Sequence, residues 1–383
     1  MLRFAIKEWK YKDNEMLLTP GPTPVPEFVR KAMSDVTIHH RTEEFEAIFK
    51  NTRELLLELY GMPEVVMLAS SGTGAMEACV TNLTHKKALT VNSGKFGERF
   101  GKICAAFGIE YTEIKNEWNT PVSVDAVVEA VKADSSIDAI FIQICESAGG
   151  LRHPVEQIAA EVKKINKDIM IIADGITAIG VEKIDTTNLD AVVTGSQKAL
   201  MLPPGLAMIG LSNAAVAKIE SKPRGYYFNL AIEIKNQRKN TTAWTAATTL
   251  IIGLGAILEK LKADGFDNLY KQTAKRANAT REALKAIGFD IYPKTPANAM
   301  TTAYTEQSSA IRKILENKYN VNIAGGQDHL AGKIFRINHM GLVEDYEASW
   351  AVNAVELALD DLGIRTFDGT ANKVFASNMF KGN

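Results

Sequence analysis

Between residues 64 and 211 the sequence alternates regularly between short apolar runs and longer amphipathic segments. Runs such as EVVMLA, IDAIFIQIC and DIMIIAD are almost continuously apolar, and the segments between them carry apolar residues at helical spacing. A strand without polar alternation is buried on both faces, and the helices that connect such strands provide the cover. We therefore predict an α/β fold built on a large, doubly wound, mainly parallel sheet.

The flanking segments extend this prediction. Two helices are expected over residues 27–33 and 43–60, the second capped by Gly61. The proline-rich TPGPTPVP, residues 19–26, should be extended or turning, because proline fixes φ and restricts the residue before it. Past residue 213 we expect long helices over 247–265 and 268–288, short strands near 299–305, 322–326 and 334–338, and a last helix over 344–363.

This change of pattern indicates a smaller α+β domain in the C-terminal part of the chain. At 383 residues the chain exceeds the usual size of one domain. We predict an N-terminal arm over residues 1–25, a large domain over residues 26–259 and a small C-terminal domain over residues 260–383.

Charge and cysteine usage limit the partners. Lys and Arg number 44 against 45 Asp and Glu, a net charge of -1 without a long run of like charge, which disfavours nucleic acid. Cys79, Cys104 and Cys145 show no CxxC spacing, as is typical of reduced thiols and not of a disulfide framework or a metal site. The first 18 residues lack the apolar region of a secretory signal, and no run of about 18 apolar residues predicts a membrane span. We expect a cytoplasmic protein that binds no metal, membrane or nucleic acid.

The first candidate site is SSGTGAME, residues 70–77, which lies between a predicted strand and a predicted helix. Glycines let the backbone approach a ligand closely, and the free N–H groups of a helix start favour phosphate. The segment lacks the Gly-Lys-Ser/Thr of a P-loop, and Glu77 stands where a dinucleotide fingerprint has its third glycine. By itself it predicts either a phosphate cradle or an ordinary strand-to-helix turn.

Two ionisable residues follow on later strands. Asp174 ends the run DIMIIAD, and ligands of open α/β sheets bind at the carboxyl ends of strands, although Asp-Gly is also a common turn pair. Lys198 lies in TGSQKALMLPPG, where apolar neighbours would lower its pKa and make the neutral, nucleophilic amine accessible. A lysine that extends its amine to water is the alternative interpretation.

Together, a phosphate cradle, a carboxylate at a strand end and a lysine in an apolar setting match the needs of pyridoxal 5'-phosphate. Its phosphate must be anchored, its aldehyde must be held by an amine, and its ring nitrogen must stay protonated so that the ring acts as an electron sink. No dinucleotide, metal or nucleoside triphosphate explains all three features as well. The sequence therefore predicts pyridoxal phosphate as the cofactor.

Six segments resemble the class V, fold-type I pyridoxal-phosphate aminotransferases, and within that class the alanine–glyoxylate and serine–glyoxylate branch. That branch includes bacterial chains named small subunit of soluble hydrogenase. The segments occur in the same order over nearly the whole chain, and TGSQKALMLPPG is the most specific of them. They are LTPGPTPVP (18–26), HHR (39–41), SGTGAME (71–77), DGITAIG (174–180), TGSQKALMLPPG (194–205) and FRINHMG (335–341).

The resemblance implies a role for each matching residue. Lys198 would hold the cofactor aldehyde, and Asp174 would partner the pyridine nitrogen. Phe96 would stack on the cofactor ring and Ser147 would lie near it, although CESAGG departs from the more common ESSTG at residues 148–149. The phosphate would be bound by Ser71, Gly72 and Thr73, with Gln197 beside them.

The resemblance also implies how substrate and partner bind. Arg336, in FRINHMG, matches the arginine that binds the substrate carboxylate, a role that suits a planar bidentate donor, and Gly21 of the proline-rich arm lies at the substrate. Thr245 matches a threonine that reaches the phosphate of a neighbouring subunit. A homodimer with shared active sites is therefore expected, although Thr242 and Ala246 stand where some relatives carry tyrosine and proline.

These features predict ping-pong transamination of a small amino acid, alanine or serine, with glyoxylate or pyruvate as the acceptor. Lys198 would be displaced by the substrate amine and would then move a proton from the substrate α-carbon, while the ring partnered by Asp174 absorbs the charge.

Three alternatives stay open to different degrees. A phosphonate or ureidoglycine aminotransferase fits the same motifs, and so does a non-enzymatic subunit that uses the fold. A cysteine desulfurase is disfavoured, because those enzymes need a cysteine in the latter part of the chain and the last one here is Cys145. The roles of His39, His40 and Arg41 are also open: they either close the site or brace it.

Overall fold

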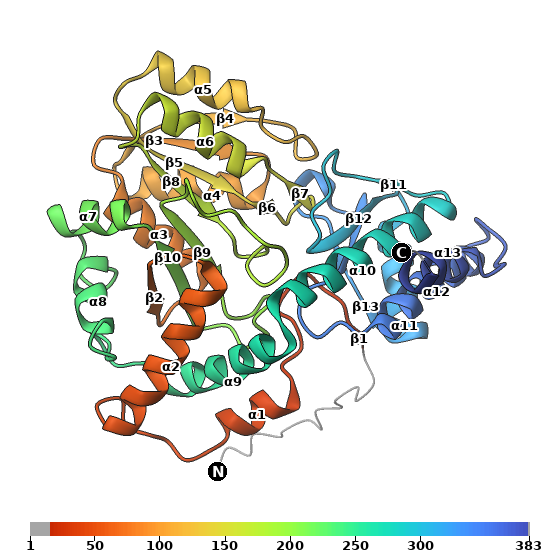
Figure 1. The fold of residues 1–383 in the computed structure, drawn as a ribbon. Helices are drawn as coiled ribbons and strands as arrows, with labels where there is room; N and C mark the ends of the chain where they lie inside the picture. The colour runs from red at the N-terminus through yellow and green to blue at the C-terminus, as the bar shows by residue number, and fades with distance from the viewer. Residues whose placement is uncertain (1–15, 382–383) are drawn as a thin grey trace, which may run out of the picture.

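The computed structural model describes residues 16–381 (Figure 1). The prediction that no secretory signal is present and the first part of the predicted arm lie outside the described residues. Within the described range, no helix combines the length and the apolar character needed to cross a membrane.

The centre of the molecule is a seven-stranded sheet in the order β2-β10-β9-β8-β5-β3-β4. The strand β10 runs antiparallel to both of its neighbours, and every other pair in the sheet is parallel, so the predicted mainly parallel sheet is confirmed. The strands are β2 (Glu64–Leu68), β3 (Lys87–Asn92), β4 (Glu110–Lys115), β5 (Ile137–Gln143), β8 (Met170–Asp174), β9 (Ala191–Gly195) and β10 (Ala207–Leu211).

Helices cover both faces of this sheet, as the apolar strands require (Figure 1). The α2 helix begins at Thr42, whose hydroxyl accepts the Phe45 N–H, and ends at Gly61 with a φ of 61°, which confirms the predicted glycine cap. One face packs on α1 (Glu27–Met33), α2 (Glu43–Tyr60), α5 (Val124–Ala133), α6 (Val155–Ile165) and α9 (Thr248–Asp264). The other packs on α3 (Gly72–Leu83), α4 (Lys95–Ala106), α7 (Asn213–Ser221) and α8 (Leu230–Gln237).

A separate antiparallel sheet with its own core forms the C-terminal part, in the order β11-β12-β15-β14. The predicted last helix exists as α12 (Asp345–Asp361) but is not the last, because α13 (Thr370–Ala376) and η2 (Ser377–Lys381) follow it. The strands are β11 (Asp290–Ile291), β12 (Met300–Tyr304), β14 (Ala324–Gly325) and β15 (Ile334–Asn338), and the other helices are α10 (Phe266–Ala286), α11 (Ser308–Tyr319) and η1 (Asp328–Leu330).

The described part of the arm joins this second unit. Its strand β1 (Met16–Leu17) pairs in parallel with β13 (Val321–Asn322), and Leu18 is buried in the C-terminal core. The packing partners change at Gly265: α9 before it contacts α1 and α2, whereas α10 after it contacts mainly α12, α13 and η2. The domain division stays a prediction, and its boundary after residue 259 falls inside α9.

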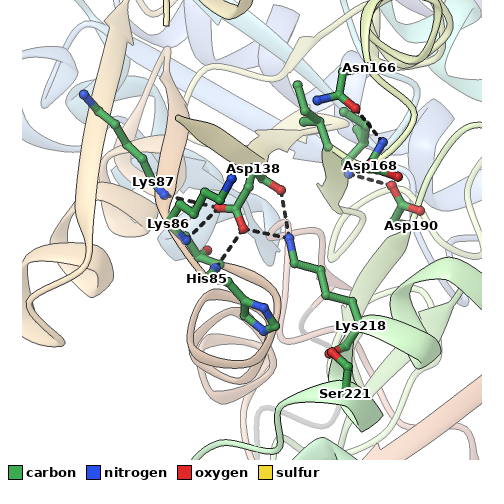
Figure 2. Close-up of polar contacts among 12 residues, drawn as sticks. His85, Lys86, Lys87, Asp138, Asn166, Asp168, Asp190, Lys218 and Ser221 are labelled. Carbon is green, nitrogen blue, oxygen red and sulfur yellow. Dashed lines mark hydrogen bonds and ion pairs between the residues drawn. The ribbon is translucent and has the colours of Figure 1, made fainter. Parts of the chain in front are cut away.

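The two ends of the large sheet carry different kinds of polar residue. At the amino ends of β3 and β5, the Asp138 carboxylate accepts backbone N–H groups from His85, Lys86 and Lys87 and an ion pair from Lys218 of α7 at 2.8 Å (Figure 2). These contacts join residues 85–87, the start of β5 and α7, and they pair the charges of Asp138 and Lys218 with each other. The carboxyl ends of the strands hold the candidate site.

Candidate active site

The predicted cofactor residues meet at the carboxyl edge of the sheet. Asp174 is the last residue of β8, and its register partner at the end of β5 is Gln143. The neighbouring strand β9 ends at Gly195, three residues before Lys198. Ligands of open α/β sheets bind at this edge, so the strand order itself brings the lysine and the carboxylate toward one space.

Lys198 sits against the proline-rich arm. Its amine donates a hydrogen bond to the Pro20 carbonyl oxygen at 2.7 Å, and its own carbonyl accepts the Thr23 hydroxyl at 2.7 Å. Burial lowers the pKa of Lys198 to about 8; the charge of Asp174 opposes this shift, whereas Arg336 and Arg99 add to it. The lowered pKa makes a minor fraction of neutral amine available near neutral pH, and the neutral amine is the nucleophilic form.

Gly21 makes this contact possible. Its φ is 92°, a value that favours glycine, and a Cβ placed on it would lie 2.5 Å from Lys198 Cδ and 2.7 Å from Nζ. The sequence resemblance placed Gly21 at the substrate. The structure places it directly against the Lys198 side chain, and its role at the substrate stays a prediction.

Asp174 is 3% exposed and has one backbone partner, the Ile176 N–H at 2.9 Å to Oδ1. Burial raises the pKa of Asp174 to about 6, against the lowering effect of that hydrogen bond and of the Arg99 and Lys198 charges. A buried carboxylate with spare acceptor capacity at a strand end is suited to bind a protonated ring nitrogen.

The start of α3 carries the predicted phosphate cradle. Ser71 is the N-cap of the helix, but its side chain forms no capping hydrogen bond, so the first N–H groups of α3 have no side-chain cap. Gly72 faces Ile176, and a Cβ there would lie 2.5 Å from Ile176 Cδ1. The Arg99 guanidinium donates to the Thr73 hydroxyl at 2.9 Å, which adds a positive charge to a helix start that already favours anions.

Phe96 lies in the first turn of α4, and the Arg99 guanidinium carbon is 4.8 Å from the centre of its ring. Arg99 therefore connects the predicted stacking ring to the predicted phosphate cradle. Sequence reasoning missed Arg99. Its signal was weak, since it is one of several charged residues in an amphipathic helix.

Glu146 is a second residue that sequence reasoning missed. It is fully buried in β6 (Cys145–Glu146), which forms a hairpin with β7 (Leu151–Arg152), and its carboxylate accepts N–H groups from Phe96, Gly97 and Ala148. Burial raises the pKa of Glu146 to about 7, although these hydrogen bonds oppose the shift. The only sequence signal for Glu146 was its position as an acidic residue directly after the apolar run IDAIFIQIC.

Gln143 is the third. It is fully buried beside Asp174, and neither its amide oxygen nor its amide nitrogen has a hydrogen-bond partner among residues 16–381. The amide oxygen of Gln197, beside Lys198, is also buried without a partner in the same range. Buried amides are normally paired, so these two mark a polar space that a bound group would complete.

Arg336 projects from β15 toward the loop after Glu146. Its Nη1 donates to the Ser147 carbonyl at 2.6 Å, and its Nε and Nη2 both donate to the Gly325 carbonyl, at 3.1 and 2.6 Å. Burial lowers the pKa of Arg336 to about 10, with Glu146 opposing and Arg312 adding to the shift. The guanidinium is thus oriented by two backbone carbonyls.

Thr245 takes part in none of the hydrogen bonds described above among residues 16–381. It is exposed in the loop before α9, in a surface depression lined by Leu68, Leu206 and Trp244. In the HHR segment, His39 accepts the Arg41 N–H through Nδ1 at 3.3 Å and contacts the His40 ring, and the choice between closing and bracing the site stays open.

These residues fit pyridoxal phosphate. Lys198 offers the amine, Asp174 the carboxylate, Arg99 and the uncapped α3 start the anion site, and the two unpaired amides mark polar space beside them. Metal chemistry has no comparable set, since the described residues contain no cluster of three or more His, Cys, Asp or Glu side chains that could hold a metal ion.

Comparison with known proteins identifies the family of the chain. Residues 17–341 match the family described as Aminotransferase class-V. An uncharacterized aminotransferase of Helicobacter pylori strain 26695 is 48% identical over 95% of this chain and 99% of its own length. The serine–glyoxylate aminotransferase of Hyphomicrobium methylovorum is 30% identical over 95% of each chain. The crystal structure of a subgroup IV aspartate aminotransferase from Thermus thermophilus, 30% identical, superposes with a TM-score of 0.85 over 91% of this chain and 99% of that one.

The fold and the site define a fold-type I pyridoxal-phosphate enzyme, an α/β protein with a mainly parallel central sheet. The chain belongs to the class V aminotransferases. It is an aminotransferase, its substrates are amino acids and keto acids, and its cofactor is pyridoxal phosphate. The alternative of a non-enzymatic subunit is therefore set aside.

Proposed function

We propose that this aminotransferase moves the amino group of a small amino acid, alanine or serine, to glyoxylate or pyruvate. The observation that carries the proposal is that Arg336, after its backbone contacts within residues 16–381, keeps one unpaired N–H on each terminal nitrogen. The similarity to a serine–glyoxylate aminotransferase at 30% identity supports the choice of donor and acceptor.

These unpaired N–H groups follow from counting donors. A guanidinium has five N–H groups. The Gly325 carbonyl accepts from Nε and Nη2, and the Ser147 carbonyl accepts from Nη1, which leaves one N–H on each terminal nitrogen. The two oxygens of a substrate carboxylate can accept from two such N–H groups. The Arg336 charge also contributes to lowering the pKa of Lys198.

Pyridoxal phosphate, when bound, supplies an electron sink for charge at the substrate α-carbon. Lys198 would accept and release the proton of the substrate α-carbon, a role that its pKa of about 8 permits near neutral pH. Asp174 would hold the ring nitrogen in its protonated form. Phe96 would cover the ring, and Ser71, Gly72, Thr73 and Gln197 would bind the phosphate.

The small size of the donor is supported by the loop after Ser147. A Cβ on Gly149 would lie 2.6 Å from the Trp118 carbonyl oxygen, and one on Gly150 would lie 2.4 Å from the Thr302 hydroxyl. With Ala148 also fully buried, this loop brings no charged side chain to the Ser147 carbonyl that orients Arg336. A second carboxylate on the substrate would have no cation supplied by this loop.

We also propose a homodimer in which Thr245 reaches the phosphate of the partner subunit. Thr245 is exposed next to Trp244, whose ring lies 4.9 Å from that of Tyr226, and Tyr226 is 78% exposed. An exposed aromatic cluster beside the residue expected to cross the interface is a surface suited to a second copy. A cytoplasmic location is proposed on the three free, buried cysteines.

The test is the absorbance of the purified, cofactor-loaded protein after it is mixed with alanine, serine, glycine, aspartate, aminoethylphosphonate or ureidoglycine separately. Conversion to the pyridoxamine form should be fastest with alanine or serine, and glyoxylate or pyruvate should reverse it. Lys198→Ala should abolish the conversion. Fastest conversion by aspartate, the substrate named for the 30% identical Thermus structure, would refute the small donor, and by aminoethylphosphonate or ureidoglycine would establish an alternative.

A further inference from the structure

We propose that Glu146 is a positioning residue. Its carboxylate fixes the backbone at Phe96 relative to the loop that orients Arg336. The proposal rests on the roles proposed above for Phe96 and Arg336. It assigns to Glu146 no contact with the reacting atoms: its effect passes through the backbone groups that it binds.

On one side, Glu146 fixes the start of α4. Its Oε2 accepts the N–H groups of Phe96 at 3.0 Å and of Gly97 at 2.8 Å. These are first-turn N–H groups that the helix itself leaves unpaired, and a carboxylate is the partner they favour. Gly94 is the N-cap, and a Cβ there would lie 2.4 Å from Glu146 Cγ and Cδ. The close fit leaves the Phe96 backbone little freedom.

On the other side, Glu146 fixes the loop that orients Arg336. Its Oε1 accepts the Ala148 N–H at 3.0 Å, and its own carbonyl accepts the Gly150 N–H at 2.9 Å. Ser147 lies between these anchored residues, and its carbonyl accepts Arg336 Nη1 at 2.6 Å. One side chain therefore sets both the helix start that carries the stacking ring and the carbonyl that aims the guanidinium.

The chemistry of the three donors explains why a glutamate is needed. The carboxylate is fully buried, and among residues 16–381 it pairs only with N–H donors, so both of its oxygens act as acceptors. A glutamine has one acceptor oxygen. It would keep two hydrogen bonds by turning that oxygen to Phe96 and Gly97, and its NH₂ group would then face the Ala148 N–H. The hydrogen bond from the Ala148 N–H, in the loop that orients Arg336, would therefore be lost first.

The experiment compares Glu146→Gln with the wild-type holoenzyme. The donor is whichever of the six compounds in the test above gives the fastest half-reaction in the wild type, so that a wrong donor assignment leaves this test intact. Loss of a hydrogen bond to a charged group corresponds to about a tenfold change in an equilibrium constant. We expect KM for the donor to rise about tenfold, with kcat and the dissociation constant of pyridoxal phosphate changed by less than about threefold.

The matched control is Glu182→Gln, which removes another largely buried carboxylate, one that pairs with Arg152 outside the site. It should lower thermal stability comparably and leave KM unchanged. Gly94→Ala is the second test: its Cβ would displace the Glu146 carboxylate without altering Glu146, and the extended backbone at Gly94, with φ of 162°, accepts alanine. Here KM and the cofactor dissociation constant should both rise.

A double-mutant cycle with Arg336→Lys completes the test. If Glu146 acts through Arg336, the effect of Glu146→Gln on KM should largely disappear in the Arg336→Lys background. Independent, multiplying effects would overturn the proposal, as would an unchanged KM in Glu146→Gln or a loss no greater than that of Glu182→Gln. If Arg336→Lys alone leaves KM unchanged, the proposed role of Arg336 is refuted. The route by which Glu146 is proposed to act is then refuted with it.

Discussion

Gly21 and Lys198 are in direct contact: a methyl group added to Gly21 would lie 2.5 Å from Lys198 Cδ and 2.7 Å from its amine nitrogen. The arm that carries Gly21 also holds the amine through the Pro20 carbonyl at 2.7 Å. The proline-rich arm is thus part of the lysine's environment. It limits the positions that the amine can take and contributes to the burial that lowers its pKa.

Gly21→Ala should therefore disable the site with a limited effect on the fold. The added methyl must displace the Lys198 side chain, and alanine at a φ of 92° costs about 1–2 kcal/mol of backbone strain. We expect pyridoxal phosphate uptake and half-reaction rate to fall at least about a hundredfold, equivalent to about 2.7 kcal/mol. Absorbance titration of the apoprotein measures the uptake.

The control for this prediction is Gly288→Ala. Gly288 has a similar φ of 96°, but nothing lies within 4 Å of a Cβ placed there. It should show only the loss of thermal stability that the backbone strain causes, and normal uptake of pyridoxal phosphate. Equal uptake of pyridoxal phosphate by the two variants would show that the Gly21–Lys198 contact does not affect cofactor binding.

The pKa of Lys198 predicts how cofactor capture depends on pH. Burial is the main cause that lowers this pKa to about 8, so the neutral amine that attacks the aldehyde is a minor species below that pH. The capture rate of apoprotein should rise about tenfold per pH unit below pH 8 and level off above it. Stopped-flow absorbance with pyridoxal phosphate measures the rate, and a midpoint near the ordinary lysine value of about 10.4 would contradict the prediction.

Asp174→Asn should separate stability from activity. Burial raises the pKa of Asp174 to about 6, so at neutral pH the ionised carboxylate lowers the unfolding free energy of the apoprotein. Because the folded pKa exceeds the unfolded one, the apoprotein loses stability as pH rises from about 4 to 6. At pH 7 the apo form of Asp174→Asn should be about 1–3 kcal/mol more stable than wild type, and kcat of the holoenzyme should fall about 10²–10⁴-fold.

Urea unfolding of both apoproteins at pH 7 and at pH 4.5 gives the comparison, and the difference should shrink at the lower pH, where the wild-type carboxyl is largely protonated. A variant that is less stable than wild type at pH 7 would mean that the Asp174 charge is well compensated in the apoprotein.

The local motifs explain how much of the site the sequence could predict. Lys198, Asp174 and the start of α3 each stand at a strand end or a helix start, and the alternation of strands and helices places such positions at one edge. Arg99 and Glu146 could not be found in this way, because their partners Thr73 and Phe96 lie 26 and 50 residues away in the chain. Their roles exist only after the chain has folded.

The same reasoning applies to the fold. The long periodic segments were predicted, whereas α7, α8, α11 and α13 were not. The α8 helix has eight residues, and its N-cap Asn229 is a common turn residue as well. Short helices depend on tertiary packing more than on their own propensity, so a single sequence gives little warning of them. Thr245 is the opposite case: its proposed role needs a second subunit.

Asp138→Asn should weaken the fold and leave the chemistry intact, because the Asp138 network lies at the amino ends of the strands (Figure 2). The Asp138 and Lys218 side chains are 15% and 14% exposed, and removing one charge leaves the other poorly solvated. We expect a loss of about 2–4 kcal/mol in unfolding free energy at pH 7, with unchanged kcat per folded molecule. Asp168→Asn, at an exposed neighbouring position, should change stability by less than about 0.5 kcal/mol.

The pH dependence of that loss checks its electrostatic origin. Burial alone would raise the pKa of Asp138, but the bond to Lys218, its positive charge and the backbone N–H groups outweigh burial and lower it. A carboxyl with a lowered folded pKa contributes stability above its unfolded pKa of about 3.9, and this contribution disappears as pH falls through the folded value. The gap between wild type and Asp138→Asn in urea unfolding should therefore be constant from pH 7 to pH 5 and narrow below about pH 4. A gap that persists unchanged at pH 3 would assign the loss to packing and hydrogen-bond geometry instead of charge.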